Sequence, residues 1–150
     1  MYVDESGFEE SVYRSHGLSM RGKRCFGDRP GTRSKRTNLI AAKRKGELLA
    51  PVLYEGTTTA AWFNEWLENH LMKELKVKST LIMDNAAFHK KSEITEIANQ
   101  AGHNVLFLPP YSPDLNPIEK VFAVLKKRRT FAPENTSIDD IVKEYGNFLE

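Results

Sequence analysis

The sequence predicts an α/β domain built on a mixed sheet, and three features of the residue pattern support this prediction. Two apolar segments in the first third of the chain flank a charged, glycine-containing turn, which is the pattern of a β-hairpin. From Thr57 onward the spacing of apolar residues changes to that of an amphipathic helix. Short apolar segments then alternate with helical ones, as they do where helices connect parallel strands.

The strands of the first third are predicted as follows. Residues 1–4 form a short apolar strand that ends at turn-forming residues, and Asp4 is its last residue. Segments 37–42 (TNLIAA) and 48–54 (LLAPVLY) are the two strands of the hairpin. Residues 21–35 contain three glycines and a proline, which favours irregular or edge structure.

The first helix is expected to begin with an N-cap among Thr57, Thr58 and Thr59. The residues expected on its inner face recur at helical spacing and are Phe63, Trp66, Leu67, His70 and Leu71. This spacing places His70 in the core or at its border. Residues 80–83 and 105–108 are predicted to be buried strands, with a helix over 92–100 between them that Gly102 ends. The final predicted helix begins at Asn116 and Pro117.

Length and composition indicate a single domain that covers all 150 residues. No run of 18 apolar residues is present, and the first residues lack the pattern of a secretory signal, so we expect a cytoplasmic protein with no membrane partner. One cysteine, Cys25, excludes an internal disulfide and a cysteine-rich zinc site.

The net charge of +2 conceals a segregation of charges along the chain. Residues 21–45 hold ten basic side chains and one acid, Asp28, and a second basic cluster occupies 126–129. Such clustering indicates either a polyanionic partner or a solvated surface without one, and charge alone leaves both open.

Three carboxylates stand at positions typical of a functional site. Asp4 and Asp84 each follow or end a predicted strand, where functional groups of α/β sheets collect, and Glu119 lies in the first turn of the last helix. Hard oxygen ligands suit Mg²⁺ or Mn²⁺, and a pair of such ions supports phosphodiester chemistry. Each also has a structural explanation: a turn cap for Asp4, a strand exit for Asp84, and a capping box with Asn116 for Glu119.

The text around these carboxylates resembles a known family. The string DNAAFH at 84–89, followed by LPPYSPDLNPIE at 108–119, closely resembles the catalytic core of mariner-superfamily DDE transposases, in particular their bacterial insertion-sequence branch. The 34 residues between Asp84 and Glu119 match the spacing of that branch, and residues 1–8 (MYVDESGF) resemble its first catalytic strand.

The resemblance implies an RNase H-like fold with a five-stranded mixed sheet flanked by helices. It implies that Asp4, Asp84 and Glu119 hold two divalent ions, Mg²⁺ or Mn²⁺, for hydrolysis at transposon ends and strand transfer into target DNA. Its partners would be double-stranded DNA and a second copy of the chain, in a prokaryotic, nucleoid-associated setting. In this family a helix-turn-helix recognises the ends; none precedes Asp4, so we expect the catalytic domain alone.

Neighbouring polar residues are candidates for auxiliary roles. Asn85 and Asn116 either orient the carboxylates, contact the scissile phosphate or cap the chain locally. His89 matches the family position five residues after the second aspartate, where it would bind a phosphate or a base; a partly buried, satisfied imidazole is the alternative. Glu5 follows Asp4 and, by strand alternation, is expected to point to the other face.

The basic clusters provide candidate DNA contacts, which give affinity without sequence information. These candidates are Arg33, Lys35, Arg36, Lys43, Arg44, Lys45, Lys126, Lys127, Arg128 and Arg129. Residues 17–24 nearly match a phosphate-binding loop, but Arg24 replaces the required Ser or Thr, so no nucleotide cofactor is expected. Two further functions stay open: a truncated, catalytically silent fragment that regulates a complete transposase, and a general RNase H-like nuclease.

Overall fold

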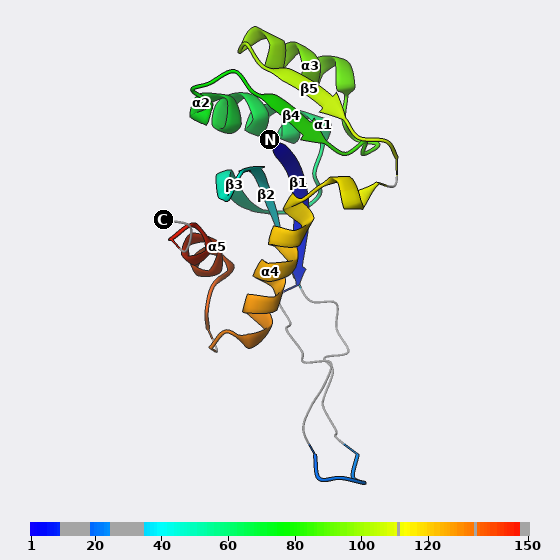
Figure 1. Ribbon diagram of the computed structural model, residues 1–150, viewed down its shortest axis with the longest axis vertical. Helices are drawn as coiled ribbons and strands as arrows, with labels where there is room; N and C mark the ends of the chain where they lie inside the picture. The colour runs from blue at the N-terminus through cyan, green and yellow to red at the C-terminus, as the bar shows by residue number, and fades with distance from the viewer. Residues whose placement is uncertain (10–18, 25–34, 111, 134, 148–150) are drawn as a thin grey trace.

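The computed structural model describes residues 1–9, 19–24, 35–110, 112–133 and 135–147. Its centre is a five-stranded sheet in the order β3-β2-β1-β4-β5 (Figure 1). The strands are β1 (Tyr2–Glu9), β2 (Arg36–Arg44), β3 (Glu47–Glu55), β4 (Thr80–Met83) and β5 (Asn104–Phe107). The first three pair antiparallel, and β1, β4 and β5 pair parallel. The predicted mixed sheet is therefore confirmed.

Helices cover both faces of the sheet. They are α1 (Ala60–Trp66), which continues through a π-helical turn η1 (Leu67–Leu71) into α2 (Met72–Glu74); α3 (Lys91–Gln100); α4 (Ile118–Phe131), preceded by the 3₁₀ turn η2 (Pro113–Leu115); and α5 (Ile138–Asn147). Helix α5 was not expected from the sequence. Among the described residues, every helix is too short or too polar to cross a lipid bilayer.

The sheet separates two hydrophobic cores. On one face Val3 and Ile40 pack with Phe63 and Trp66 from the first helix, and Ile94 from α3 joins them. The opposite core joins sheet residues to α4 and α5; its buried members are Phe8, Leu39, Ala41, Ile118, Val121, Phe122, Leu125, Ile141 and Val142. Because side chains alternate along a strand, the even residues of β1 face α4 and the odd ones face the first helix.

Strand β1 is longer than predicted, so the expectation that it ends at Asp4 is wrong. Each of its residues pairs with β2, from Tyr2 opposite Lys43 to Glu9 opposite Arg36, and this pairing carries the strand through the turn-forming residues. On its other edge, β4 pairs only with Tyr2 and Val3. Asp4 therefore lies inside β1, at the point where β4 ends, and no described strand pairs with that edge beyond it.

The predicted hairpin is confirmed, with a two-residue turn at Lys45 and Gly46 between the paired Arg44 and Glu47. Lys45 has a left-handed backbone with φ of 54°. The pairing shifts register where Ala50, with φ of 47°, bulges out of β3. Its N–H donates to Glu74 Oε2 (2.8 Å), and its carbonyl accepts from Trp66 Nε1 (2.9 Å). The main-chain N–H and carbonyl of the bulged Ala50 are thus both hydrogen-bonded to side chains of the α1–η1–α2 helix.

Thr59 is the N-cap of the first helix, and its hydroxyl accepts the N–H of Trp62 at 3.2 Å, as expected for this threonine run. The predicted core position of His70 is wrong, because this side chain is exposed while Leu71 is buried. A π-helical turn holds more residues per turn than the 3.6 assumed from spacing, so positions beyond Leu67 are rotated around the axis.

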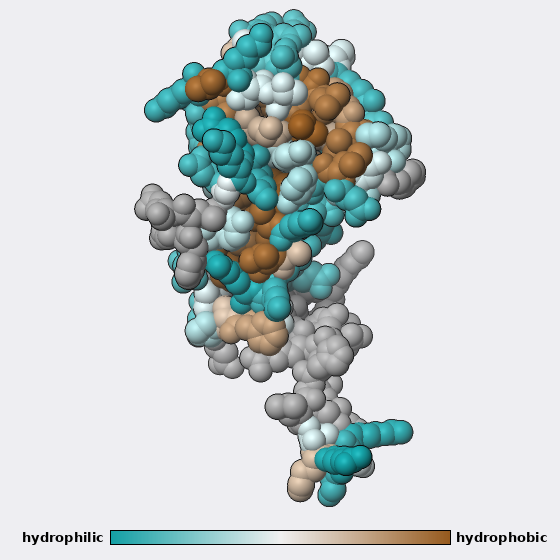
Figure 2. Space-filling view, in the orientation of Figure 1, coloured by the Kyte–Doolittle hydropathy of each residue, from teal (hydrophilic) through white to brown (hydrophobic). Residues whose placement is uncertain are grey.

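Strand β5 is an edge strand, and the prediction that it is buried is wrong. Val105 and Phe107 pack against the core, but Leu106 points to the other face and is 53% exposed. Apolar atoms gather over this end of the sheet in Figure 2. Helix α3 matches its prediction to within one residue, and Gly102 follows it with a φ of 83°.

Candidate active site

Three chain elements bring the predicted carboxylates to one end of β4. Asp4 is an even residue of β1 and therefore faces α4, while Asp84 is the first residue after β4. The parallel pairing of Val3 with Met83 places these two aspartates next to each other on adjacent strands. Glu119 is the second residue of α4, and Ile118 beside it is fully buried, which anchors this first turn on the sheet.

The surroundings of Asp4 change the acidity of its carboxyl group. Its Oδ1 accepts the N–H of Glu5 at 2.8 Å. Burial, together with the smaller effect of the charges of Asp84, Glu119 and Glu5, raises the pKa of Asp4 to about 7 even though this bond lowers it. A bound cation would favour the ionised form of this carboxyl.

The donor set fits hard divalent cations, because it consists of carboxylate oxygens from three elements. Among the described residues, however, no three His, Cys, Asp or Glu side chains lie close enough together to hold a single ion. The three carboxylates therefore form an open group rather than a closed cage around one ion.

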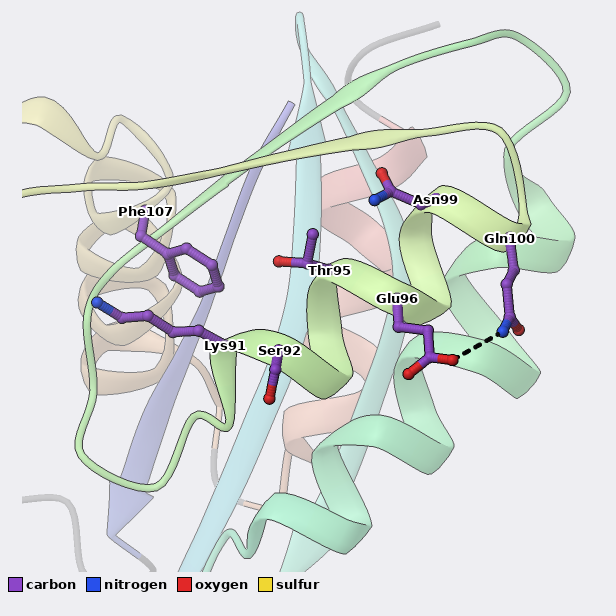
Figure 3. A pocket seen from close by; sticks show the side chains of 7 residues that line it. All are labelled: Lys91, Ser92, Thr95, Glu96, Asn99, Gln100 and Phe107. Carbon is purple, nitrogen blue, oxygen red and sulfur yellow. Dashed lines mark hydrogen bonds between the residues drawn. The ribbon is translucent and has the colours of Figure 1, made fainter.

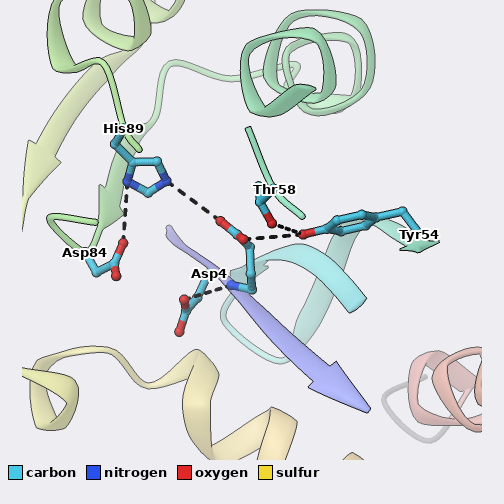
Figure 4. Close-up of polar contacts among 6 residues, drawn as sticks. Asp4, Tyr54, Thr58, Asp84 and His89 are labelled. Carbon is cyan, nitrogen blue, oxygen red and sulfur yellow. Dashed lines mark hydrogen bonds and ion pairs between the residues drawn. The ribbon is translucent and has the colours of Figure 1, made fainter. Parts of the chain in front are cut away.

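His89 connects this group to the other face of β1 (Figure 4). The side chain is buried; its Nδ1 lies 3.5 Å from Asp84 Oδ1 and its Nε2 lies 3.8 Å from Glu5 Oε1. Neither distance is a hydrogen bond, and neither nitrogen has another partner among the described residues. The ring packs against Phe63 and Phe88, with centroids 4.5 and 4.3 Å away. The alternative of a satisfied imidazole is therefore wrong.

Glu5 joins the site although sequence reasoning left it out. It points to the face opposite Asp4, as strand alternation predicted, and there it meets His89. Its Oε2 accepts from the Tyr54 hydroxyl at 3.4 Å, which in turn hydrogen-bonds to Thr58 Oγ1 at 2.5 Å. Figure 4 shows this row of polar side chains, from Asp84 to Thr58. The only signal in the sequence was its position next to Asp4.

Asn116 does not cap α4. Its side chain is 3% exposed, and neither amide atom has a hydrogen-bond partner among the described residues. Glu119 donates its N–H to the main-chain carbonyl of Asn116 at 3.1 Å, and the helix begins without a side-chain cap. The capping-box explanation of Glu119 is therefore wrong. Asn85 is exposed beside Asp84.

Two of the candidate DNA contacts lie beside the carboxylates. Arg36 and Lys126 line a groove of about 470 Å³ together with Asp4 and Glu119. Arg33 lies outside the described residues, and Lys35 and Lys127 are exposed.

The remaining candidates lie elsewhere or make protein contacts. Lys43, Arg44 and Lys45 lie at the hairpin turn, the opposite end of β2 from Arg36, and Arg44 is 3.9 Å from Glu47. Arg128 lies over the Tyr145 ring, and Arg129 donates to the Glu9 carbonyl at 3.2 Å.

A surface hollow of about 740 Å³ lies away from the carboxylates, on the outer side of α3 (Figure 3). Its lining residues are Lys91, Ser92, Thr95, Glu96, Asn99, Gln100 and Phe107. Gln100 Nε2 donates to Glu96 Oε1 at 3.3 Å, and Lys91 lies over the Phe107 ring. With one acid already bonded within the helix and one cation over a ring, this hollow offers no convergent reactive groups.

Comparison with known proteins assigns the chain to a family. A family model described as "DDE superfamily endonuclease" matches residues 1–141. The chain belongs to the DDE superfamily endonucleases. A search of curated proteins gave no match. The matched residues of this DDE endonuclease include all three carboxylates and the buried His89 and Asn116.

Solved structures similar to this DDE endonuclease include Mos1 transposase. The mariner Mos1 paired-end complex with Mg aligns with a TM-score of 0.76 at 20% identity, over 99% of this chain and 46% of that one. The Mos1 strand transfer complex aligns at 0.75 and 23% identity, over 99% and 45%. A simian T-cell lymphotropic virus intasome chain aligns at 0.61 and 14% identity, over 96% and 45%. These likenesses confirm the RNase H-like fold, and the chain spans about half the length of these relatives.

Proposed function

We propose that this DDE endonuclease is the catalytic domain of a DNA transposase of the bacterial insertion-sequence branch of the mariner superfamily. Asp4, Asp84 and Glu119 are its catalytic carboxylates in this proposal. The observation that carries it is geometric: the pairing of Val3 with Met83 places Asp4 beside Asp84 at the end of β4, and Asp4 and Glu119 line the same groove. The family string between Asp84 and Glu119 supports the same assignment.

The carboxylates are proposed to hold two divalent cations, Mg²⁺ or Mn²⁺. Paired-end complexes of Mos1 have been solved with each of these metals. Such ions would activate the attacking oxygen and stabilise the leaving one during phosphodiester hydrolysis. Asp4 lies within β1, Asp84 directly follows the adjacent strand β4, and Glu119 lies in the first turn of α4, so secondary structure fixes or directly precedes each proposed ligand.

The DNA-processing steps are proposed by analogy. Hydrolysis at each transposon end would free a 3′ hydroxyl, which would then attack target DNA. Mos1 has been solved in paired-end and strand transfer complexes, and such assemblies support a homodimer on two DNA ends. We propose that residues 1–150 act as one catalytic domain in this process.

The test is metal-dependent nicking of DNA that carries element ends. Asp4→Asn, Asp84→Asn and Glu119→Gln should each abolish nicking by the purified chain in Mg²⁺ or Mn²⁺. Asp114→Asn is the matched control, since this exposed aspartate lies in η2 within the same family string and should leave nicking unchanged. Wild-type nicking by Asp84→Asn would contradict the site. An inactive wild-type chain would favour the silent regulatory fragment instead.

A further inference from the structure

The open edge of β1 forms the floor between two polar hollows. Its residues Glu5, Ser6 and Gly7 line both of them. One hollow, about 370 Å³, lies toward Thr57 and Thr58, and the other contains Asp4, Glu119 and Lys126. Arg36 lines both, so its guanidinium lies across this edge. Because β4 ends at Met83, no strand among the described residues pairs with this edge from Asp4 onward.

Gly7 allows Arg36 to lie against the strand. A Cβ atom added at Gly7 would come within 1.8 Å of Arg36 Nε and 2.3 Å of its Cζ. These distances are too short for non-bonded atoms, so any side chain at position 7 would displace the guanidinium. Arg36 Nε donates to Asn38 Oδ1 at 3.1 Å, and Asn38 Nδ2 donates to the Gly56 carbonyl at 2.7 Å. The guanidinium is therefore fixed through Nε, while its two Nη groups make no hydrogen bond to another described residue.

Lys126 places a second cation on the same groove from the opposite wall. It stands seven residues after Glu119 on α4, about two turns, so both side chains lie on the same face of the helix. Its ammonium lies 5.9 Å from the centroid of the Phe8 ring. Within the part of the chain that the structure describes, neither Lys126 nor Arg36 has a carboxylate within ion-pair distance.

We propose that Arg36 and Lys126 clamp one backbone phosphate of a DNA strand that follows the open edge of β1. The proposal rests on the proposed function, which places the reacting phosphate at Asp4. Gly7 is three residues further along the strand, ~10 Å away, which corresponds to about three nucleotide steps of B-form DNA. The guanidinium fork suits phosphate oxygens, and two cations offset the repulsion that three nearby carboxylates exert on DNA.

The test is binding of a short fluorescent DNA duplex, measured by anisotropy in EDTA so that no cleavage occurs. Arg36→Gln and Lys126→Gln should each weaken binding by about tenfold, the expected loss of one charged hydrogen bond. Each should also make the dependence of log K on log salt less steep, by about one. The double variant should lose less DNA affinity than the product of the two single fold losses, because both cations hold the same phosphate.

Gly7→Ala separates placement from bulk charge. This variant keeps the net charge but displaces the guanidinium, so it should weaken binding about as much as Arg36→Gln and add nothing in the Arg36→Gln background. Lys120→Gln is the control for charge, since Lys120 lies on the same helix but outside the groove. Circular dichroism checks that each variant folds.

Two results would overturn the clamp: wild-type binding by Gly7→Ala, or equal losses in Lys120→Gln and Lys126→Gln. Binding in EDTA does not require metal or catalysis. The binding test can therefore contradict the clamp while nicking still depends on Asp84. It can equally support the clamp while nicking does not depend on Asp84. Failure of the clamp is thus distinguishable from failure of the proposed function.

Discussion

His89 Nδ1 lies 3.5 Å from Asp84 Oδ1, and this nitrogen belongs to a buried ring whose other nitrogen faces Glu5. The ring thereby connects a carboxylate that follows β4 to one on the opposite face of β1. Phe63 and Phe88 hold it in place by packing. We interpret His89 as a positioning residue for Asp84, since it reaches the proposed ligand without lying in the open carboxylate group itself.

His89→Phe should keep the fold and lose activity. A phenyl ring can pack against Phe63 as the imidazole does and removes two buried, unpartnered nitrogens, so the free energy of unfolding should be unchanged or higher. Nicking rate should fall by about 10- to 100-fold, as is typical when the group orienting a metal ligand is removed. His103→Phe is the control: this buried histidine accepts the Ser79 N–H, so its loss should lower stability and leave nicking intact. Equal nicking rates in His89→Phe and wild type would contradict the positioning role.

Asn116→Ala should also separate stability from activity. The amide makes no hydrogen bond in the described structure, so its removal should change the free energy of unfolding by about 1 kcal/mol or less. If the amide serves the reacting groups beside Glu119, nicking should fall by about tenfold. Asn64→Ala is the counterpart, because that side chain donates to Glu93 Oε2 at 2.7 Å and lies on the first helix. A stability loss in Asn116→Ala with unchanged nicking would assign Asn116 to packing alone.

Asp4→Asn should stabilise the metal-free chain in a pH-dependent way. The folded state raises the pKa of this carboxyl from its ordinary value of 3.8 to about 7, so folding is penalised progressively as pH rises between these values and constantly above them. Asparagine carries no such penalty. The gain in Tm in EDTA should therefore grow from about pH 4 to pH 7 and then level off. The corresponding gain in the free energy of unfolding has an upper limit of about 4 kcal/mol.

Added Mg²⁺ provides the second half of this measurement. Above pH 7 it should raise the Tm of the wild-type chain, because an ion that binds only the folded state stabilises it, and it should leave Asp4→Asn unchanged. A Tm gain for Asp4→Asn that is the same at pH 4.5 and pH 8 would show that folding does not raise the pKa of Asp4.

Lys45→Gly should stabilise the hairpin. A non-glycine residue with a left-handed backbone is strained by ~1–2 kcal/mol, whereas glycine costs ~0.4–1 kcal/mol through the entropy of the unfolded chain. The expected net gain is about 0.5 kcal/mol in urea unfolding. Lys43→Gly has only the cost, since Lys43 lies within β2, and should lower stability. A loss in both variants would show that the turn backbone is not strained.

Local patterns predicted the strands and helices that depend on their own residues. The hairpin, β4, α3 and the start of α4 follow from apolar spacing and turn residues near them in sequence. The errors arise where distant segments decide the outcome. Pairing with β2 extends β1 through Ser6 and Gly7, and the edge position of β5 exposes Leu106. The π-helical turn that rotates His70 outward leaves no mark that residue spacing alone reveals.

The site could be predicted only in part for a similar reason. Asp84 and Glu119 stand in a distinctive string, so their residue types and spacing were sufficient to select them. The contribution of Glu5 depends on a contact with a histidine 84 positions away, which no local pattern contains. The same applies to Arg36, whose place in the groove depends on the missing side chain of Gly7.

The uneven lengths of β1 and β4 also bear on how copies of this chain associate. An open strand edge invites pairing with another chain and, with it, aggregation, and charged or flexible residues along such an edge discourage this. Here Asp4, Glu5 and Gly7 occupy that edge, so the charges assigned to chemistry would also keep the molecule from adding a strand to a neighbour. Neutral substitutions that silence the enzyme therefore remove a safeguard against self-association as well.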